Sequence, residues 1–404
     1  MKKISLLIVM ILLFGCTEPY LLQTSNFEEA LVIEATITNE LKTQQIRLTK
    51  TYRLEENGPE FVENANISVE DDFGNVYNFT EGNEVYESQN PFQAIAGRRY
   101  KLRIIVNGKT YTSTPEVLSA VNPIQNVEVH DVTIAGDRGA EIKVKSFDPT
   151  GNSKYYRYEF EETYKVIAPK WKPNTVTINP NFNALGSKDL IFTPRTYEAQ
   201  TCYSTFKSNE LLLHSTSNLS EDRVDYMVRF IHVTNPIIKH RYSILVNQYV
   251  QNLESYTYYS TLKSISGSGS ILSQNQPGFF RGNITCESNP NEKVIGFFDV
   301  SSKSSQRIFF NFADVFPGTT APGYFYDCYD NCVDEPGEYN CPGVYNFCFE
   351  IGNPNSTCEG ENVEAQLNTG NLLYYSGPNP IYLVPLPCGD CTQFSSNVVP
   401  TFWQ

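Results

Sequence analysis

The sequence has few of the residues that most often carry chemistry. Histidine occurs four times, methionine three times and tryptophan twice in 404 residues. The histidines are scattered, with no HExxH motif, at positions His130, His214, His232 and His240. No G-x-S-x-G elbow precedes a helix, and no glycine-rich phosphate loop follows a strand. These absences argue against a zinc hydrolase, an elbow-type serine hydrolase and a nucleotide enzyme, so we expect no catalytic site and no metal.

Positive charge is also scarce. The chain has 31 lysines and arginines against 45 aspartates and glutamates, which gives a formal net charge of -14. Binding to nucleic acid depends on clustered basic side chains that contact phosphates, so no nucleic-acid partner is expected. The same balance argues against a polybasic membrane patch, and the acidity mainly favours solubility. Beyond the first sixteen residues no apolar run is long enough to cross a bilayer, which takes about 20 residues.

The first sixteen residues, MKKISLLIVMILLFGC, have a different composition. Two lysines precede a short apolar run over residues 4–14, and Gly15 leads into Cys16. This pattern is typical of a secretory signal, and Leu-x-Gly-Cys resembles the bacterial lipobox, in which the cysteine is acylated. We expect residues 1–15 to be a lipoprotein signal peptide, Cys16 to carry palmitate-type chains, and residues 16–28 to be a flexible tether. An ordinary cleaved signal with a nearby cysteine is the alternative.

The rest of the chain favours β-sheet. It contains 26 tyrosines and 25 phenylalanines, and glycine and proline punctuate it. Residues 29–120 read as about seven strands, with Asn107-Gly108 suited to a type I′ hairpin turn. We expect a β-sandwich there that is similar in pattern to carboxypeptidase-regulatory and transthyretin-like domains. Residues 123–317 resemble a second, fibronectin type III or immunoglobulin-like sandwich, with a proline- and asparagine-rich loop over 168–200.

One long helix is expected in the second sandwich, over residues 240–266. Apolar side chains recur there at spacings of three to four residues, which is typical of a helix that packs one face on a sheet. This stripe consists of Ile244, Tyr249, Leu253, Tyr256, Tyr259 and Leu262. A helix that docks a partner through the same stripe is the alternative.

Residues 318–404 form a cysteine-rich tail in which core-forming residues become sparse. An exported protein meets an oxidising compartment, so disulfides are expected, and an odd number of cysteines leaves at least one thiol without a partner in the chain. Zinc binding or a redox role of Cys388-x-x-Cys391, and calcium binding by acidic residues of the tail, are the alternatives. The disulfide candidates are Cys202, Cys286, Cys328, Cys332, Cys341, Cys348, Cys358, Cys388 and Cys391.

Aromatic side chains crowd the same tail. Tyrosine gives contact area at small entropic cost, so tyrosines held on a rigid disulfide framework suit recognition of a partner. The candidates for partner binding are Tyr324, Tyr326, Tyr329 and Tyr345. The alternative is that these rings form a small core within the tail.

Motifs within residues 239–310 carry a family resemblance. They include RYSI-x-V-x-Q, the following L-E-x-Y-x-Y, Q-P before G-N-I, and E-K-V-x-G-F-F-x-V-S. Together with the lipobox, the early stretch ALVIEATITNEL and the closing Phe402-Trp403, they resemble the Bacteroidota exported lipoprotein family catalogued as domain of unknown function 4249. The resemblance implies an exported lipoprotein, often found beside TonB-dependent outer-membrane transporters, and it brings no catalytic residues.

These expectations lead to a first hypothesis about function. The protein would be a non-enzymatic outer-membrane lipoprotein without a cofactor, anchored through Cys16, that captures substrate for a TonB-dependent transporter or caps it. Glu18, close behind the cysteine, resembles the surface-export signal of Bacteroidota lipoproteins and favours the cell surface, and a solvated linker is the alternative. The alternatives are a structural or assembly subunit of an outer-membrane complex, and a hydrolase with an unrecognised site.

Overall fold

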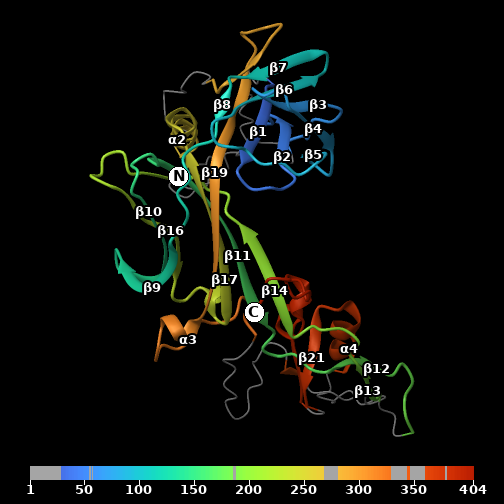
Figure 1. The fold of residues 1–404 in the computed structure, drawn as a ribbon. Helices are drawn as coiled ribbons and strands as arrows, with labels where there is room; N and C mark the ends of the chain where they lie inside the picture. Colours follow the sequence, from blue (N-terminus) through green and yellow to red (C-terminus); the bar gives the residue numbers. More distant parts are fainter. Residues whose placement is uncertain are drawn as a thin grey trace, which may run out of the picture.

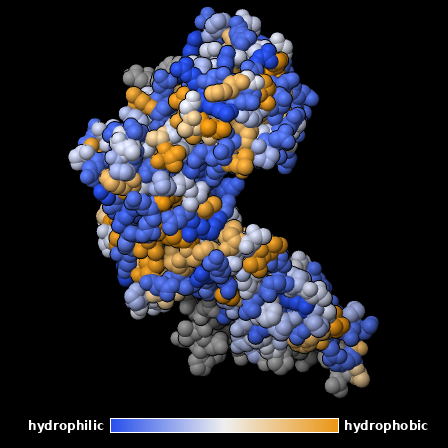
Figure 2. Space-filling view, viewed as in Figure 1, coloured by the Kyte–Doolittle hydropathy of each residue, from blue (hydrophilic) through white to orange (hydrophobic). Residues whose placement is uncertain are grey.

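The computed structural model describes residues 29–53, 56, 58–184, 188–267, 281–328, 344–345, 360–377 and 380–404. The expected signal peptide, Cys16 and the tether lie outside these residues. Strands dominate the described chain and helices are few, which confirms the mainly-β class. The molecule is elongated, with an N-terminal lobe at one end, a central region of packed sheets, and a C-terminal lobe at the other end (Figure 1). Figure 2 shows that the surface is hollowed on one side between the two end lobes.

The N-terminal lobe is a curled sheet that surrounds one core. Its strands lie in the order β1-β2-β5-β4-β3-β6-β7-β18, with β8 beside β6. Alternate side chains of β6 are buried, as expected for a strand with one face on a core. Buried side chains from β1 through β7 and from β18 belong to one cluster, so the sheet curves around them. The bounds are β1 Leu31–Thr38, β2 Gln45–Lys50, β3 Asn66–Asp71, β4 Val76–Glu81, β5 Tyr86–Ser88, β6 Arg99–Val106, β7 Lys109–Ser113, β8 Glu116–Val117 and β18 Ile284–Cys286.

The hairpin predicted at Asn107-Gly108 is confirmed. β6 and β7 pair antiparallel up to Val106 and Lys109. Asn107 and Gly108 both have positive φ, at 52° and 73°. A type I′ turn requires positive φ at both central residues, and its twist matches that of the strands it joins.

Strand β19 (Val294–Asn311) joins the N-terminal lobe to the central region. Its first part pairs parallel with β1, and its second part pairs antiparallel with β17 (Arg241–Gln251). We expected two separate sandwiches here, and the structure instead connects both regions through one sheet of fourteen strands among the described residues. Gly296 permits the pairing with β1, because a Cβ atom there would lie 2.3 Å from the carbonyl oxygen of Ile33.

In the central region two sheets pack face to face. β11 (Tyr155–Ile167), β17 and β19 form one layer, and a three-stranded sheet in the order β16-β10-β9 forms the other. Both layers contribute to one core, for example through Tyr158, Ile244 and Val144. Such packing is sandwich-like. The other bounds are β9 Asn126–Ile134, β10 Asp137–Asp148, β14 Thr201–Lys207, β15 Leu212–Ser215, β16 Asp222–His232, η1 Pro236–Ile238 and α3 Phe312–Val315.

The helix expected over residues 240–266 is wrong in its first half. Residues 241–251 form β17, which pairs with β11 on one side and β19 on the other. Tyr242, Ile244 and Val246 alternate into the core from this strand. As a strand, the segment satisfies its backbone through two neighbours and buries its apolar side chains at the same time. The predicted stripe took some of its apolar residues from this strand and the others from the helix that follows it. Together they gave a spacing of three to four residues.

Helix α2 (Leu253–Gly267) follows directly and packs on the sheet as expected, with only part of the predicted stripe on the packed face. Of this stripe, Tyr256 packs on Tyr155 of β11, with 5.0 Å between ring centroids, and Tyr259 packs on Arg157 of the same strand. Leu253, which the predicted stripe included, is 57% exposed. Ser255 and Tyr258 are buried instead. The ring of Tyr258 packs against Phe297 of β19, with 5.5 Å between ring centroids.

The C-terminal lobe combines the tail with part of the segment that we expected to be a loop. Residues 168–200 contain the hairpin β12–β13, which packs through Ile178 against Val363 and Leu383. This loop prediction was therefore wrong for the two strands, which are only five residues long each and are flanked by the proline- and asparagine-rich residues on which the prediction rested. The bounds are β12 Asn174–Ile178, β13 Leu190–Pro194, β20 Val344–Tyr345, α4 Gly360–Thr369, β21 Leu372–Ser376, β22 Ile381–Pro385, α5 Leu386–Gly389 and η2 Cys391–Gln393.

Candidate functional site

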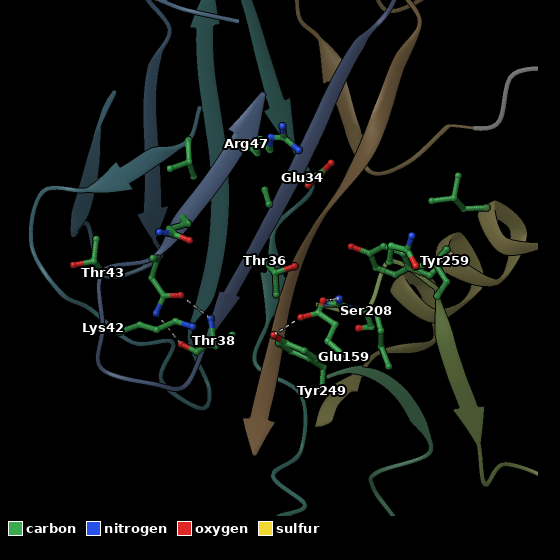
Figure 3. Close-up of a pocket in the computed structure, with 18 residues that line it drawn as sticks. Glu34, Thr36, Thr38, Lys42, Thr43, Arg47, Glu159, Ser208, Tyr249 and Tyr259 are labelled. Carbon is green, nitrogen blue, oxygen red and sulfur yellow. Dashed lines mark hydrogen bonds and ion pairs between the residues drawn. The ribbon is translucent and has the colours of Figure 1, made fainter. Parts of the chain in front are cut away.

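A cleft lies between the N-terminal lobe and the central sheet (Figure 3). One wall consists of β1, β2 and the turn between them, and the other consists of β11, residues 208–211, β17 and α2. Its volume of about 800 Å³ is in the range of pockets that hold small ligands. Strand β19 determines the cleft, because it pairs with β1 on one side and with β17 on the other and so holds the two walls beside each other.

Arg157 lines the cleft although it is only 7% exposed. On β11 the side chains of Tyr156, Tyr158 and Phe160 enter the core between the central sheets. Because neighbouring side chains of a strand point to opposite faces, Arg157 and Glu159 lie on the other face, toward the cleft. The core-forming tyrosines thus fix which face of β11 presents charge.

The guanidinium group of Arg157 is held between two aromatic rings. Its Cζ lies 4.3 Å from the ring centroid of Tyr249 and 5.1 Å from that of Tyr259. Nη1 forms an ion pair with Glu159, and Nε has no hydrogen-bond partner among the described residues. Burial opposes the charged form, but Tyr259, Glu159 and Tyr249 together raise the pKa of Arg157 above its ordinary value. Arg157 is therefore a fixed positive charge at the cleft.

Glu159 is the more accessible partner in this pair. Its side chain is 42% exposed, against 9% for that of Arg157. The hydroxyl of Tyr249 donates a hydrogen bond of 3.0 Å to Oε2 of Glu159 (Figure 3). Burial, and then the nearby carboxylate of Glu159, raise the pKa of Tyr249, which remains a neutral donor near neutral pH.

The opposite wall is held rigid by Gln44, which is fully buried. The amide nitrogen of its side chain donates to the carbonyl oxygens of Glu40 (3.0 Å) and Phe92 (2.8 Å), and its amide oxygen accepts from the backbone of Thr38 (3.3 Å). These bonds fix the turn between β1 and β2. Lys42 on this turn pairs with Glu40 at 2.9 Å.

A buried polar network lies close to Arg157, away from the cleft opening. The carboxylate of Asp299 accepts hydrogen bonds from Ser301 (2.7 Å) and Gln251 (3.3 Å), and Gln251 also donates to Ser255 (2.8 Å). Oδ1 of Asp299 and Oε1 of Gln251 have no partner among the described residues. Asp299 also contributes to raising the pKa of Arg157. Asp299 thus adds a small contribution that favours the charged form of Arg157, and the network joins α2 to β17 and β19.

The structure describes three of the four tyrosines predicted to bind a partner, and these three differ in burial. Tyr324 is half-buried, donates to the carbonyl oxygen of Pro387 (2.9 Å), and packs on Phe394. Tyr345 packs on the core of the C-terminal lobe. Tyr326 is 43% exposed, with its ring 5.0 Å from that of Phe394. Tyr329 lies outside the described residues. Tyr324 and Tyr345 thus follow the alternative of a small core, and Tyr326 keeps an accessible ring.

The disulfide prediction is confirmed for four cysteines. Cys202 pairs with Cys391, and Cys328 pairs with Cys388, so the two cysteines of the C-x-x-C motif bond to other partners and not to each other. Cys286, another of the disulfide candidates, is free and buried in the N-terminal lobe. The other candidates, Cys332, Cys341, Cys348 and Cys358, lie outside the described residues.

Two alternatives for the tail involve metal ions. Within the described ranges, no group of three or more histidine, cysteine, aspartate or glutamate side chains could hold a metal ion. The acidic residues at positions 330, 334, 335 and 338 lie outside these ranges, so calcium binding there stays an alternative. Asp390, inside the C-x-x-C motif, is buried and pairs with Arg195 at 3.2 Å, and it accepts a hydrogen bond from Tyr197 at 2.8 Å. Burial raises its pKa, but hydrogen bonds from Thr392 and Tyr197 outweigh this and lower the pKa below its ordinary value. Asp390 therefore braces the lobe as an ionised group.

The sequence did not reveal the cleft. Its lining comes from segments around residues 34–47, 157–159, 208–211 and 249–262, which no motif connects. The one available signal was Arg157 and Glu159 between the aromatic residues of YYRYEF, which indicates a strand with one charged face. That signal places charge on a face, but it does not say which other segment faces it.

Comparisons with known proteins give one family and one distant structure. In the described ranges no helix has both the length and the apolar character needed to cross a membrane. No curated protein matches the chain. A solved structure titled "Biofilm associated protein - BSP domain" matches with 7% identity and a TM-score of 0.13, over 69% of this chain and 58% of that one. This similarity is too low to indicate a shared fold. A family described as domain of unknown function (DUF4249) matches residues 17–307, as the motifs predicted. The chain belongs to this DUF4249 family.

Proposed function

We propose that this protein is a non-enzymatic, lipid-anchored accessory protein of the outer membrane, exposed at the cell surface, that captures substrate for a TonB-dependent transporter. The observation that carries the capture role is the cleft beside Arg157, which has a fixed charge and a rigid wall. The lipid anchor at Cys16 rests on the lipobox pattern, and the transporter rests on the family resemblance.

The cleft suits binding because its groups are already held in place. The guanidinium of Arg157 is fixed between two rings, and Gln44 fixes the turn on the opposite wall. On the wall that carries Arg157, residues 208–211 are anchored by two hydrogen bonds between Ser208 and the backbone of Phe160, at 2.8 and 2.9 Å. Groups that need not be ordered on binding cost less entropy, so such a site gains affinity for a given set of contacts.

The position of the cleft also fits an anchored capture protein. The proposed tether, residues 16–28, would reach at most about 45 Å when extended. It leads into β1, and β1 itself supplies part of the cleft wall from Glu34 to Thr38. The cleft thus begins on the strand that directly follows the proposed tether, which supports capture beside a transporter in the same membrane.

The test is purification of the full chain from detergent-solubilised outer membrane, beside a Cys16→Ser variant. We expect wild type to carry labelled acyl chain and to bring down a TonB-dependent barrel, and the variant to lose both label and membrane partition. Recovery of a larger assembly machine without a transporter would support the subunit alternative and overturn the capture role. A variant that stays acylated and membrane-bound would overturn the anchor.

A further inference from the structure

We propose that the cleft recognises a small polar ligand through a carboxylate group, and that Glu159 holds the ligand's place on Arg157 until the ligand enters. The proposal deepens the capture role, since it takes the cleft as the capture site. It names the chemical class of the ligand and the side chain that the ligand displaces.

The first step is the placement of Arg157. Burying a cation is costly, and a buried ion pair is weak evidence for stability. The guanidinium is nevertheless held almost completely buried at the cleft by the rings of Tyr249 and Tyr259. Its planar fork of donors matches the two oxygens of a carboxylate. A carboxylate is thus the ligand group that this arrangement accommodates best.

The second step is the asymmetry between the two partners. The guanidinium of Arg157 is packed between two rings and its side chain is 9% exposed, whereas the side chain of Glu159 is 42% exposed. The carboxylate of Glu159 is also bonded by Tyr249, which can equally donate to a ligand oxygen in the same place. A ligand carboxylate can therefore exchange for Glu159 without leaving Arg157 or Tyr249 unpaired.

The third step is the charge around the cleft. Lys42 and Arg47 line the opposite wall, and Glu34 is the other acidic residue that lines it. Arg47 is 3.8 Å from Glu84, and Lys42 is paired with Glu40. Asp299 lies behind Arg157 and helps to keep it charged. With Glu159 turned away, the cleft is lined by the cations of Arg157, Lys42 and Arg47. The remaining carboxylate in the lining is that of Glu34, so the balance of charge favours an anionic ligand.

The rest of the lining indicates what the ligand carries besides its carboxylate. Hydroxyl and amide side chains surround the cleft, and they can donate to and accept from a polar ligand. They are Thr36, Thr43, Gln45, Ser208 and Asn209. Sugar acids and acidic peptides share this chemistry, a carboxylate beside hydroxyl or amide groups, and the probes below distinguish them.

The experiment is isothermal titration calorimetry of the detergent-solubilised full chain. The probes are D-glucuronate, an N-acetylated glutamyl amide, and D-glucose as the neutral control. We expect at least one of the two acids to bind and D-glucose not to bind. The acid that binds identifies the source of the carboxylate, and binding of both shows that the carboxylate alone dominates.

Variants test the roles of the two charged residues. Glu159→Gln removes the competing negative charge, so the ligand carboxylate no longer has to displace another carboxylate from Arg157. Binding of the acid should tighten by about fivefold or more. Arg157→Lys keeps the charge but loses the fork, and it should weaken binding by about tenfold. Glu161→Gln is the matched control, because Glu161 is two residues along β11 and pairs with Arg307 at 3.0 Å outside the cleft lining. It should leave the affinity unchanged.

Two outcomes would overturn the proposal. One is that neither acid binds to the wild-type chain. The other is that the acid binds equally well to wild type, Glu159→Gln and Arg157→Lys, which would place its site elsewhere. Failure of the capture role looks different: the acid binds with the expected pattern, but no transporter is recovered with the protein. Recovery of a transporter without acid binding would overturn only the ligand assignment.

Discussion

The N-terminal and C-terminal lobes are stabilised in different ways. In the N-terminal lobe one continuous core links every strand from β1 through β7, and its described cysteine, Cys286, is free. In and around the C-terminal lobe the buried apolar side chains form three small clusters, none with more than four fully buried residues. Two disulfides tie this lobe together, and Cys202–Cys391 also ties it to β14 of the central sheet.

The difference shows how much a core can do without cross-links. A small unit buries a small fraction of its surface, so it gains little from apolar burial. A disulfide instead stabilises by restricting the unfolded chain, typically by about 2–4 kcal/mol. The N-terminal lobe buries enough to need none, and the C-terminal lobe does not. Five predictions run from the largest expected effect to the smallest. The first three test this contrast, and the last two extend it to the central region.

The largest effect should come from Phe298→Ala in the N-terminal lobe. Phe298 is fully buried on β19, in the core of this lobe. Removal of a buried phenylalanine side chain costs about 3–5 kcal/mol through lost transfer energy and the cavity left behind. Urea denaturation should show this loss. Phe73→Ala, at an exposed position, is the control and should cost little; equal losses would mean that the core does not carry the lobe.

The second largest effect on stability should come from removing the Cys202–Cys391 disulfide with a Cys202→Ser, Cys391→Ser double variant. The free energy of unfolding of the C-terminal lobe should fall by about 2–4 kcal/mol. Limited proteolysis read by mass spectrometry should show new cuts in the C-terminal lobe and none in the N-terminal lobe. Cys286→Ala, which breaks no disulfide, is the comparison. If protease cuts both lobes alike, the two lobes unfold together and the contrast fails.

The third effect is Asp390→Asn, which removes the charge that Arg195 pairs with at 3.2 Å. Both side chains are buried, and Arg195 would keep a hydrogen bond to Tyr197 at 3.2 Å. We expect a loss of about 1–3 kcal/mol in the C-terminal lobe, as for a hydrogen bond to a charged group. Thermal melting of wild type and variant at neutral pH measures it. A melting temperature above that of wild type would mean that desolvation of the pair outweighs its attraction.

The fourth prediction contrasts the central region with the N-terminal lobe in acid. Between η1 and β17 of the central region, burial first, and then Lys239 and Lys165, lower the pKa of His240 to about 4. The unfolded chain takes up this proton below about pH 6.5, so stability is lost as pH falls from about 6.5 to 4. In the N-terminal lobe, burial raises the pKa of Asp71, but hydrogen bonds from Asn75, Arg98 and Phe73 outweigh it and lower the pKa to about 2. That contribution is present above about pH 3.8 and is lost only between about 3.8 and 2.

Melting temperatures between pH 7 and 2 check these windows. His240→Gln should flatten the decline between about pH 6.5 and 4 and leave the decline below pH 3.8 unchanged. Asp71→Asn should lower stability at pH 7 and flatten the decline below pH 3.8 instead. If His240→Gln leaves the upper window unchanged, another group carries it.

The smallest effect is expected for Leu253→Asp at the start of α2. Leu253 is exposed, and an acidic residue in the first turn of a helix is slightly favourable, so the change should stay within about 0.5 kcal/mol. Tyr258→Ala, on the buried face of the same helix, should cost several times more. Equal losses would mean that the exposed face of α2 is covered in solution.

The sequence predicted the local features that one segment can encode alone. The Asn107-Gly108 turn, the alternating strand β6 and the mainly-β class all follow from residue type and spacing within short windows. Residues 240–266 show the limit of this reasoning. A strand that alternates at 242, 244 and 246, followed by a helix that buries 255 and 258, produces spacings that a single helix would also give. Only pairing with β11 and β19, which are distant in sequence, decides between them.

The number of cysteines predicted that disulfides form, but the sequence did not determine which cysteines pair. Cys202 and Cys391, which form one disulfide, are 189 residues apart in the sequence. They meet only because the tail folds back onto β14. The cleft has the same origin, since Arg157, Gln44 and Tyr259 are brought together by the pairing of β19 with both β1 and β17. The sequence by itself determined composition, strand faces and turn chemistry, because these depend on neighbours in the chain. The tertiary structure decided the shared sheet, the disulfide pairs and the cleft, because these depend on which distant strands hydrogen-bond to each other.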